Sequence, residues 1–286
     1  MDLCNLSVIK GLMADAGITF RKEFGQNFLI NRIIPEDIAE NCSDTTEAMI
    51  LEIGPGIGCL TKELALRYKK VVAVEIDKGL VPILDKTLAD FDNVTVVNND
   101  ILKVDLPSFI REHSEGLPVY VCANLPYYIT TPIIMGLIES GVEFKAITVM
   151  IQNEVAARLT APAGKSDYGA ITAIIGYYGS VRKLFKVSAS SFMPAPKVDS
   201  AVIRIDLYDM PRYKLQDEEL FKKLIKFAFE MRRKTLLNAL SSKLSSFSKE
   251  QILSAIVSIG HDEMVRGEKL STEDYVNLAN KLSEMK

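Results

Sequence analysis

The fold is decided by the stretch Leu51-Glu52-Ile53-Gly54-Pro55-Gly56-Ile57-Gly58, in which a strand-like apolar run enters a turn rich in glycine. Glycine lets the backbone approach a ligand without a Cβ in the way, and a helix predicted from Leu60 offers its N-terminal amides. The pattern is G-x-G-x-G, because Cys59 occupies the position of the third glycine of dinucleotide-binding dehydrogenases. The stretch therefore predicts a turn that binds a nucleotide-like cofactor, with a purely structural tight turn as the alternative.

Strands and helices alternate outward from this stretch. Continuous β-branched runs separated by helical segments imply a parallel sheet covered on both faces. Two last strands are joined only by a loop and predict an antiparallel pair. We therefore expect an α/β fold with a doubly wound, mostly parallel, seven-stranded Rossmann-like sheet of the methyltransferase type. The predicted strands are 49–53, 71–75, 94–97, 119–123, 144–151, 181–187 and 200–207, and the predicted helices are 3–16, 35–42, 60–68, 79–88, 106–113 and 168–178.

The character of the chain changes at Asp209-Met210-Pro211, after which the sequence is predicted to be helical. Phe221, Leu224, Ile225, Ala228 and Met231 have the i, i+3, i+4, i+7 spacing of an apolar helix face. A second helix is predicted over 252–259, and Ser271 with Asp274 resembles the capping box of a last helix. We expect a catalytic domain over 1–208, with an N-terminal helical lid over 1–45, and a small all-helical domain over 209–286.

Acidic residues stand near the ends of three predicted strands. Glu75 follows Gly54 at the distance where a carboxylate accepts from both ribose hydroxyls, and Asp100 is placed to accept from an adenine amino group. Glu52 is placed to meet a cationic or amino-acid group, or only to brace the turn. The glycine turn contains no lysine to neutralise a pyrophosphate. S-adenosylmethionine, which has ribose and adenine but no phosphate, therefore fits better than NAD.

The turn Asn124-Leu125-Pro126-Tyr127 directly follows the apolar run at 119–123. The Asn124 side-chain oxygen and the Leu125 carbonyl can accept the two N–H bonds of a planar exocyclic amine while the Tyr127 ring stacks on the base. Such acceptors favour a pyramidal, nucleophilic nitrogen and stabilise the charge that develops there. A methylated ammonium loses its proton to water, so no general base is required. The turn predicts group transfer to the amine of a base, with a structural turn as the alternative.

The whole chain resembles the bacterial small-subunit ribosomal RNA adenine N6,N6-dimethyltransferases. The resemblance runs from Gly25-Gln26-Asn27-Phe28-Leu29 through the two turns and Asn99-Asp100 to Phe192-Met193-Pro194-Ala195-Pro196-Lys197-Val198-Asp199-Ser200 and Arg232-Arg233-Lys234-Thr235-Leu236. It implies S-adenosylmethionine-dependent dimethylation of two adjacent adenosines in the 3′-terminal hairpin loop of 16S ribosomal RNA, and a contribution to small-subunit biogenesis.

The resemblance also implies a set of site residues. Tyr127 and Phe192 would sandwich the target adenine, although an isolated phenylalanine is more often a core residue. Gln26 and Asn27 would belong to a cofactor lid, with capping of the helix near Pro35 as the alternative. The expected catalytic residues are Asn124, Leu125, Tyr127 and Phe192, and the expected cofactor residues are Gln26, Asn27, Leu29, Glu52, Gly54, Gly56, Glu75, Ile76, Asp100, Ile101 and Asn124.

The net charge of −3 lacks the basic signature of a nucleic-acid-binding protein, so RNA contacts should be local. Between Arg212 and Lys243 there are nine Lys or Arg against four Asp or Glu, and Glu230 is the only acid after Lys222. We expect this segment to dock RNA, with a solvated helix face as the alternative. The expected RNA-binding residues are Lys222, Lys223, Lys226, Arg232, Arg233 and Lys234.

Composition excludes several other classes. No apolar run approaches the roughly 20 residues of a membrane span, and no export signal is present, so we expect a cytoplasmic protein. Four scattered cysteines and two histidines predict reduced thiols and no metal site, which argues against a zinc deaminase. The expected partner is the small ribosomal subunit, bound by a monomer.

Three alternatives remain open at the level of sequence. The closest is a large-subunit (23S) adenine methyltransferase of the macrolide-resistance type, disfavoured by the long helical tail, the acidic balance and Leu125, where that family usually has isoleucine. Another is an assembly factor of the small subunit in which methylation is secondary. A dinucleotide-dependent dehydrogenase is the most distant, because the third glycine is missing.

Overall fold

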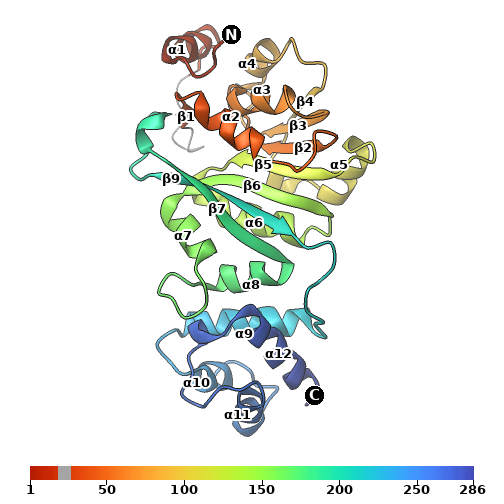
Figure 1. The fold of residues 1–286 in the computed structure, drawn as a ribbon, viewed down its shortest axis with the longest axis vertical. Coiled ribbons are helices and arrows are strands. Elements are labelled where there is room, and N and C mark those ends of the chain that lie inside the picture. Colours follow the sequence, from red (N-terminus) through yellow and green to blue (C-terminus); the bar gives the residue numbers. More distant parts are fainter. Residues whose placement is uncertain (19–26) are drawn as a thin grey trace. The chain divides into compact units, whose positions relative to one another are not determined.

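The computed structural model describes residues 1–18 and 27–286, and a seven-stranded sheet is the centre of the N-terminal part (Figure 1). Its strands are β2 (Met49–Ile53), β3 (Lys70–Glu75), β4 (Val94–Asn98), β5 (Val119–Asn124), β6 (Phe144–Gln152), β7 (Gly179–Val187) and β9 (Ser200–Leu207).

The strand order is β4-β3-β2-β5-β6-β9-β7. The first five strands in this order are parallel to one another. Strand β9 runs antiparallel to β6, with Ala146 opposite Asp206 and Gln152 opposite Ser200. The predicted α/β architecture is confirmed: a mostly parallel sheet that is closed at one edge by late strands.

Both faces of the sheet are covered. Successive side chains of a strand point to opposite faces, and every residue of β2 is buried, as are all residues of β3 and β5 except one at an end. Such strands need helices on both sides, which explains the continuous apolar runs of the sequence. The helices of this part are α1 (Leu6–Asp15), α2 (Ile33–Glu40), α3 (Cys59–Ala65), α4 (Val81–Thr87), α5 (Leu106–His113), α6 (Thr130–Glu139) and α7 (Asn153–Thr160).

Some elements were not predicted. Helix α6 is apolar on most of its surface, with Ile133, Ile134, Leu137 and Ile138 all buried, so its pattern lacks a polar face that would reveal a helical period. The two-residue strands β1 (Phe28–Leu29) and β8 (Phe192–Met193) form a small antiparallel ribbon. A ribbon this short has no periodicity to detect.

Contacts between residues divide the chain into two compact units, one made of 1–156 and 182–207 and the other of 157–181 and 208–286. The expected division placed 157–181 with the sheet, whereas helix α8 (Ala170–Tyr178) has its core contacts in the helical unit. Tyr177 and Phe221 lie with ring centroids 5.5 Å apart. The apolar sequence of α8 does not reveal which core it joins.

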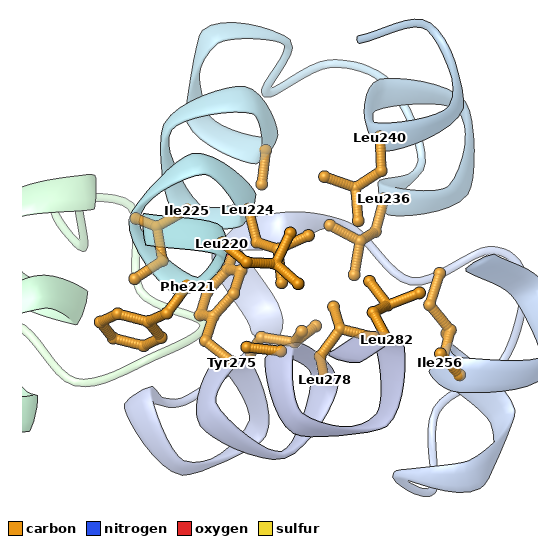
Figure 2. Close-up of a cluster of buried hydrophobic side chains, with 14 of the residues drawn as sticks. Leu220, Phe221, Leu224, Ile225, Leu236, Leu240, Ile256, Tyr275, Leu278 and Leu282 are labelled. Carbon is orange, nitrogen blue, oxygen red and sulfur yellow. The ribbon is translucent and has the colours of Figure 1, made fainter. Parts of the chain in front are cut away.

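The helical unit has its own core, centred on Leu220, Phe221, Leu224 and Tyr275 (Figure 2). The predicted apolar helix face is confirmed for Phe221, Leu224, Ile225 and Ala228, whereas Met231 follows the end of the helix and is only half-buried. The capping box of Ser271 and Asp274 is confirmed as well. Its remaining helices are α9 (Glu218–Glu230), α10 (Leu236–Ser241), α11 (Lys249–Ser258) and α12 (Thr272–Ser283). Among the described residues, no helix has the length and apolar character that a bilayer crossing requires.

Candidate active site

A cavity opens at the carboxyl ends of β2 and β5, two neighbouring strands in the interior of the sheet. Strands β3 and β4 lie on one side of β2 and strands β5 and β6 on the other, so the order of strand addition reverses between β2 and β5. Open α/β sheets bind ligands at this switch point. The cavity brings together twelve predicted site residues: Asn27, Leu29, Glu52, Gly54, Gly56, Glu75, Ile76, Asp100, Ile101, Asn124, Leu125 and Tyr127.

The glycine turn forms one wall of the cavity. Gly54, Gly56 and Gly58 all have left-handed backbone conformations, with φ of +69°, +63° and +90°. A Cβ at Gly56 would lie 3.4 Å from the Phe28 ring, against which the turn packs. That distance is ordinary van der Waals contact, so the positive φ values, which side-chain-bearing residues rarely adopt, are what favour glycine at these positions.

Glu75 is buried at the end of β3 and braces the glycine turn. Its Oε2 accepts from the Gly56 N–H at 3.1 Å, and its Oε1 accepts from the Asp77 N–H at 2.8 Å. Burial raises the pKa of Glu75, and the two backbone N–H donors oppose that shift. Each carboxylate oxygen has two acceptor sites, so both can still receive a ligand hydroxyl.

Glu52 lies at the floor of the cavity and is only 1% exposed. Its Oε2 is buried and has no hydrogen-bond partner among the described residues. Burial raises the pKa of Glu52 to about 8. A buried carboxylate oxygen without a donor is costly, and a cationic or N–H-bearing ligand group would satisfy it.

Asp100 stands on the third side, where its Oδ1 accepts from the Leu102 N–H at 3.1 Å and caps the short helix η2 (Ile101–Lys103). These acids and glycines fit the ribose, adenine and charged ends of S-adenosylmethionine. The residues present therefore suit the cofactor predicted from the sequence.

Side-chain hydrogen bonds position the turn after β5 at the cavity. The Asn124 Nδ2 donates to the Asn27 carbonyl at 3.5 Å, a bond that does not use the acceptor oxygen Oδ1. The Tyr127 hydroxyl lies 2.6 Å from the Ser200 Oγ. The Pro126 carbonyl accepts from the Thr130 hydroxyl at 3.2 Å. These bonds fix the amide and the aromatic ring that the predicted chemistry needs.

Phe192 is not brought to the cavity. Its side chain is 2% exposed and packs in the core of the sheet, because β8 pairs with β1 and sets Phe192 opposite Leu29. Phe192 does not line the cavity in this structure, and its expected role as the second ring around the target adenine stays a prediction. Gln26, the remaining predicted cofactor residue, lies outside the described residues.

Two aromatic residues of the cavity were not among the predicted site residues. Phe28 packs on Gly56, and Tyr128 is exposed beside Tyr127. Phe28 stands within the quoted stretch at 25–29, and Tyr128 directly follows the catalytic turn. A search for aromatic residues next to both motifs would have found them.

The predicted RNA-docking cations differ among themselves. Lys222 and Lys223 pair with Glu218 and Glu219 at 2.7 Å, and Lys226 lies 3.9 Å from Glu230. With Glu230 as the only acid after Lys222, the sequence indicated too few acids for pairing within the helix. This is wrong for Lys222 and Lys223, because Glu218 and Glu219 lie one turn before them.

The other three cations do not lie on that helix. Helix α9 ends at Glu230, and the turn that follows carries Arg232, Arg233 and Lys234. Arg232 lies 3.6 Å from Glu268 and donates to the Ser166 carbonyl at 2.7 Å. Arg233 and Lys234 are exposed and form no ion pair with any described residue. They are the two cations that remain available to a polyanion.

Known proteins are similar in sequence to this chain along nearly its full length. A family model described as "Ribosomal RNA adenine dimethylase" matches residues 17–284. The chain is 46% identical over 277 residues to the ribosomal RNA small subunit methyltransferase A of Alkaliphilus metalliredigens, covering 97% of this chain and 96% of that protein. It is 45% identical over 285 residues to the protein of the same name from Streptococcus pneumoniae, covering 99% and 98%.

Solved structures share the fold. The dimethyladenosine transferase from Plasmodium falciparum superposes with a TM-score of 0.76 at 26% identity, covering 90% of this chain and 97% of that one. The 23S rRNA methyltransferase ErmE gives 0.70 at 26% identity, covering 90% and 100%. The site geometry and these likenesses agree: the chain belongs to the ribosomal RNA adenine dimethylase family, and it is a methyltransferase of the S-adenosylmethionine-dependent type.

Proposed function

We propose that this enzyme dimethylates the N6 amino groups of two adjacent adenosines in the 3′-terminal hairpin loop of 16S ribosomal RNA, and so contributes to small-subunit biogenesis. The observation that carries the proposal is the convergence of the Asn124–Tyr127 turn and the acids Glu52, Glu75 and Asp100 on one cavity. Relatives at 46% and 45% identity are named for the small subunit, which favours this substrate over 23S RNA.

The cofactor assignments follow from the donors and acceptors in the cavity. S-adenosylmethionine supplies a methyl group carried on a sulfonium. Glu75 would accept from the ribose hydroxyls, Asp100 from the adenine amino group, and the orphaned Glu52 Oε2 would face the cationic end. The residues that would shape the remaining walls are Asn27, Leu29, Gly54, Gly56, Ile76 and Ile101, and Gln26 stays a sequence-based prediction.

The target amine would be held by Asn124 and Leu125. The Asn124 Oδ1 and the Leu125 carbonyl would accept its two N–H bonds, and they stabilise positive charge as the nitrogen gains a methyl group. The Tyr127 ring, fixed by Ser200, would stack on the base and contribute ~1–3 kcal/mol. The proton of the methylated ammonium leaves to water, because this amine is acidic once alkylated. Phe192 would join the stack only if its ring left the core.

RNA docking is assigned mainly to Arg233 and Lys234, the exposed cations of the turn after α9. Lys222, Lys223, Lys226 and Arg232 would contribute less, since each has an acidic partner. A cytoplasmic monomer acting on ribosomal particles is part of the proposal. An assembly role without methylation is less well supported, because the cavity keeps its complete set of acids and the Asn124–Tyr127 turn.

The test is mass analysis of nucleosides from small subunits that lack these methyl groups, after incubation with the protein and labelled S-adenosylmethionine. We expect N6,N6-dimethyladenosine in the 3′-terminal hairpin of 16S RNA. Large subunits serve as the parallel substrate. Label confined to 23S RNA would instead support the macrolide-resistance type, and label in neither would support the assembly role alone.

A further inference from the structure

Tyr128 is an aromatic residue whose exposure sets it apart. Its side chain is 61% exposed, and every other aromatic side chain of the described residues is at least half-buried. It also lines the cavity, next to Tyr127. A single exposed apolar side chain is ordinary, but an exposed ring at the mouth of a cavity offers a flat apolar face to a ligand.

The backbone beneath Tyr128 is fixed. Tyr128 is the middle residue of the short helix η3 (Tyr127–Ile129). The Ile129 N–H donates to the Pro126 carbonyl at 3.2 Å, and the Thr130 hydroxyl shares its one hydrogen between the carbonyls of Pro126, at 3.2 Å, and Tyr127, at 3.4 Å. The ring is therefore presented from a rigid turn, which limits the entropy lost when a base stacks on it.

Tyr127 and Tyr128 cannot serve the same base in the same way. Successive side chains of a 3₁₀ turn diverge by about 120°, because the turn has about three residues per revolution. The Tyr127 ring is tied to Ser200 by its hydroxyl, whereas the Tyr128 ring is directed elsewhere and is open to solvent. Two diverging rings at one cavity mouth suit two different bases.

We propose that Tyr128 stacks on the nucleotide adjacent to the target adenosine. The inference rests on the proposed function, in which the two modified adenosines are neighbours. When one base enters the cavity its neighbour loses a stacking partner, and unstacking costs free energy. The Tyr128 ring replaces that partner, so it is a positioning residue that holds the RNA in register while either adenosine reacts.

The test compares Tyr128→Ala, Tyr128→Leu and Tyr128→Phe on small subunits that lack the methyl groups. Loss of one base–aromatic stack should raise KM for the subunit on the order of tenfold in the Ala and Leu variants, while Phe stays near the parental value. The salt dependence of subunit binding should not change, because no phosphate contact is lost. Calorimetry should show unchanged affinity for S-adenosylmethionine.

A matched control is Leu66→Ala, which removes a side chain of the same 61% exposure from a position that does not line the cavity. It should behave as the parental enzyme. Subunits in which the neighbouring adenosine is replaced by uridine give the second arm: a weaker stacking base should shrink the effect of Tyr128→Ala.

Equal KM values for parental enzyme and Tyr128→Ala would overturn the role of Tyr128, as would a Leu variant that matches the Phe variant. An equal effect of Tyr128→Ala on the uridine-substituted subunits would overturn it as well. A parental enzyme that methylates no adenosine of these subunits would instead overturn the proposed function.

Discussion

The two units of this protein use ionisable side chains in opposite ways. In the sheet unit, Glu52 and Glu75 are 1% and 4% exposed and face a cavity. In the helical unit, Lys222 and Lys223 form ion pairs with acids of their own helix, at the surface. Burial makes each polar contact of a carboxylate costly to lose, whereas an exposed pair contributes about 0–1 kcal/mol. We therefore expect cofactor binding and chemistry to be sensitive to single substitutions at the carboxyl ends of the strands. RNA docking should be less sensitive to single substitutions.

The largest expected effect is that of Asn124→Ala. It removes an acceptor at the reacting nitrogen and should lower kcat on the order of 10²-fold or more, by analogy with loss of a single oxyanion donor. Subunit binding should change little. Single-turnover methylation and a binding assay would separate the two, with Asn238→Ala, an exposed asparagine of the helical unit, as the control. A near-parental rate for Asn124→Ala would remove Asn124 from the mechanism.

Next in size is Glu75→Ala, which should weaken S-adenosylmethionine binding by about 1.5–3 kcal/mol, as for a lost hydrogen bond to a charged group. Titration calorimetry measures this directly. Glu75→Gln keeps one acceptor oxygen, so its affinity for S-adenosylmethionine should lie between those of the parental protein and Glu75→Ala. An unchanged affinity in a folded Ala variant would contradict the cofactor assignment.

The pKa of Glu52 allows the effect of burial on a carboxyl group of the sheet unit to be tested without any ligand. Its folded pKa of about 8 lies above that of an exposed glutamate, so the folded state holds an extra proton between roughly pH 4.5 and 8. The stabilisation that comes from this proton on Glu52 is complete below that window. The free energy of unfolding then falls as the pH rises through the window, by ~1.4 kcal/mol per pH unit.

Glu52→Gln should make this loss of stability less steep and leave the contribution of Glu75, whose pKa burial also raises. Urea unfolding measured at several pH values between 5 and 8 would show it. The matched variant Glu47→Gln, at an exposed glutamate, should keep the parental slope. If parental protein and Glu52→Gln lose stability equally across the window, Glu52 does not carry the extra proton.

The smallest effect is expected in the helical unit. Replacing Arg233 and Lys234 together with Ala should flatten the salt dependence of subunit binding by up to about 1.4–1.8 units, at ~0.7–0.9 per phosphate contact. The corresponding pair Lys222 and Lys223 should change it less, since both lysines already have acidic partners. Equal slopes in both double variants would mean that Arg233 and Lys234 contact no more phosphates than Lys222 and Lys223 do.

Periodicity and strand-end chemistry were sufficient to predict the sheet, the cavity acids and the catalytic turn. Residues such as Glu75 and Asn124 were found because the carboxyl ends of parallel strands lie at the same end of the sheet. The position of Phe192 was not predictable, since it depends on pairing with Leu29 across a two-residue ribbon. The partners of Lys222 and Lys223 were missed because only acids that follow the lysines were considered. In the same way, the apolar sequence of α8 did not identify its core.

The Tyr127–Ser200 contact has a consequence for how the protein is made. Its partners are 73 residues apart, and Leu29 and Phe192 are farther apart still. A nascent chain leaves the ribosome at about 5–20 residues per second, so the glycine turn and the Asn124 turn emerge seconds before Ser200 does. Closing such long loops is entropically expensive and comes late in folding. A partly synthesised chain would already hold the acids of the cavity, yet it would lack the bond that fixes the Tyr127 ring, and methylation would have to await the last strand of the sheet.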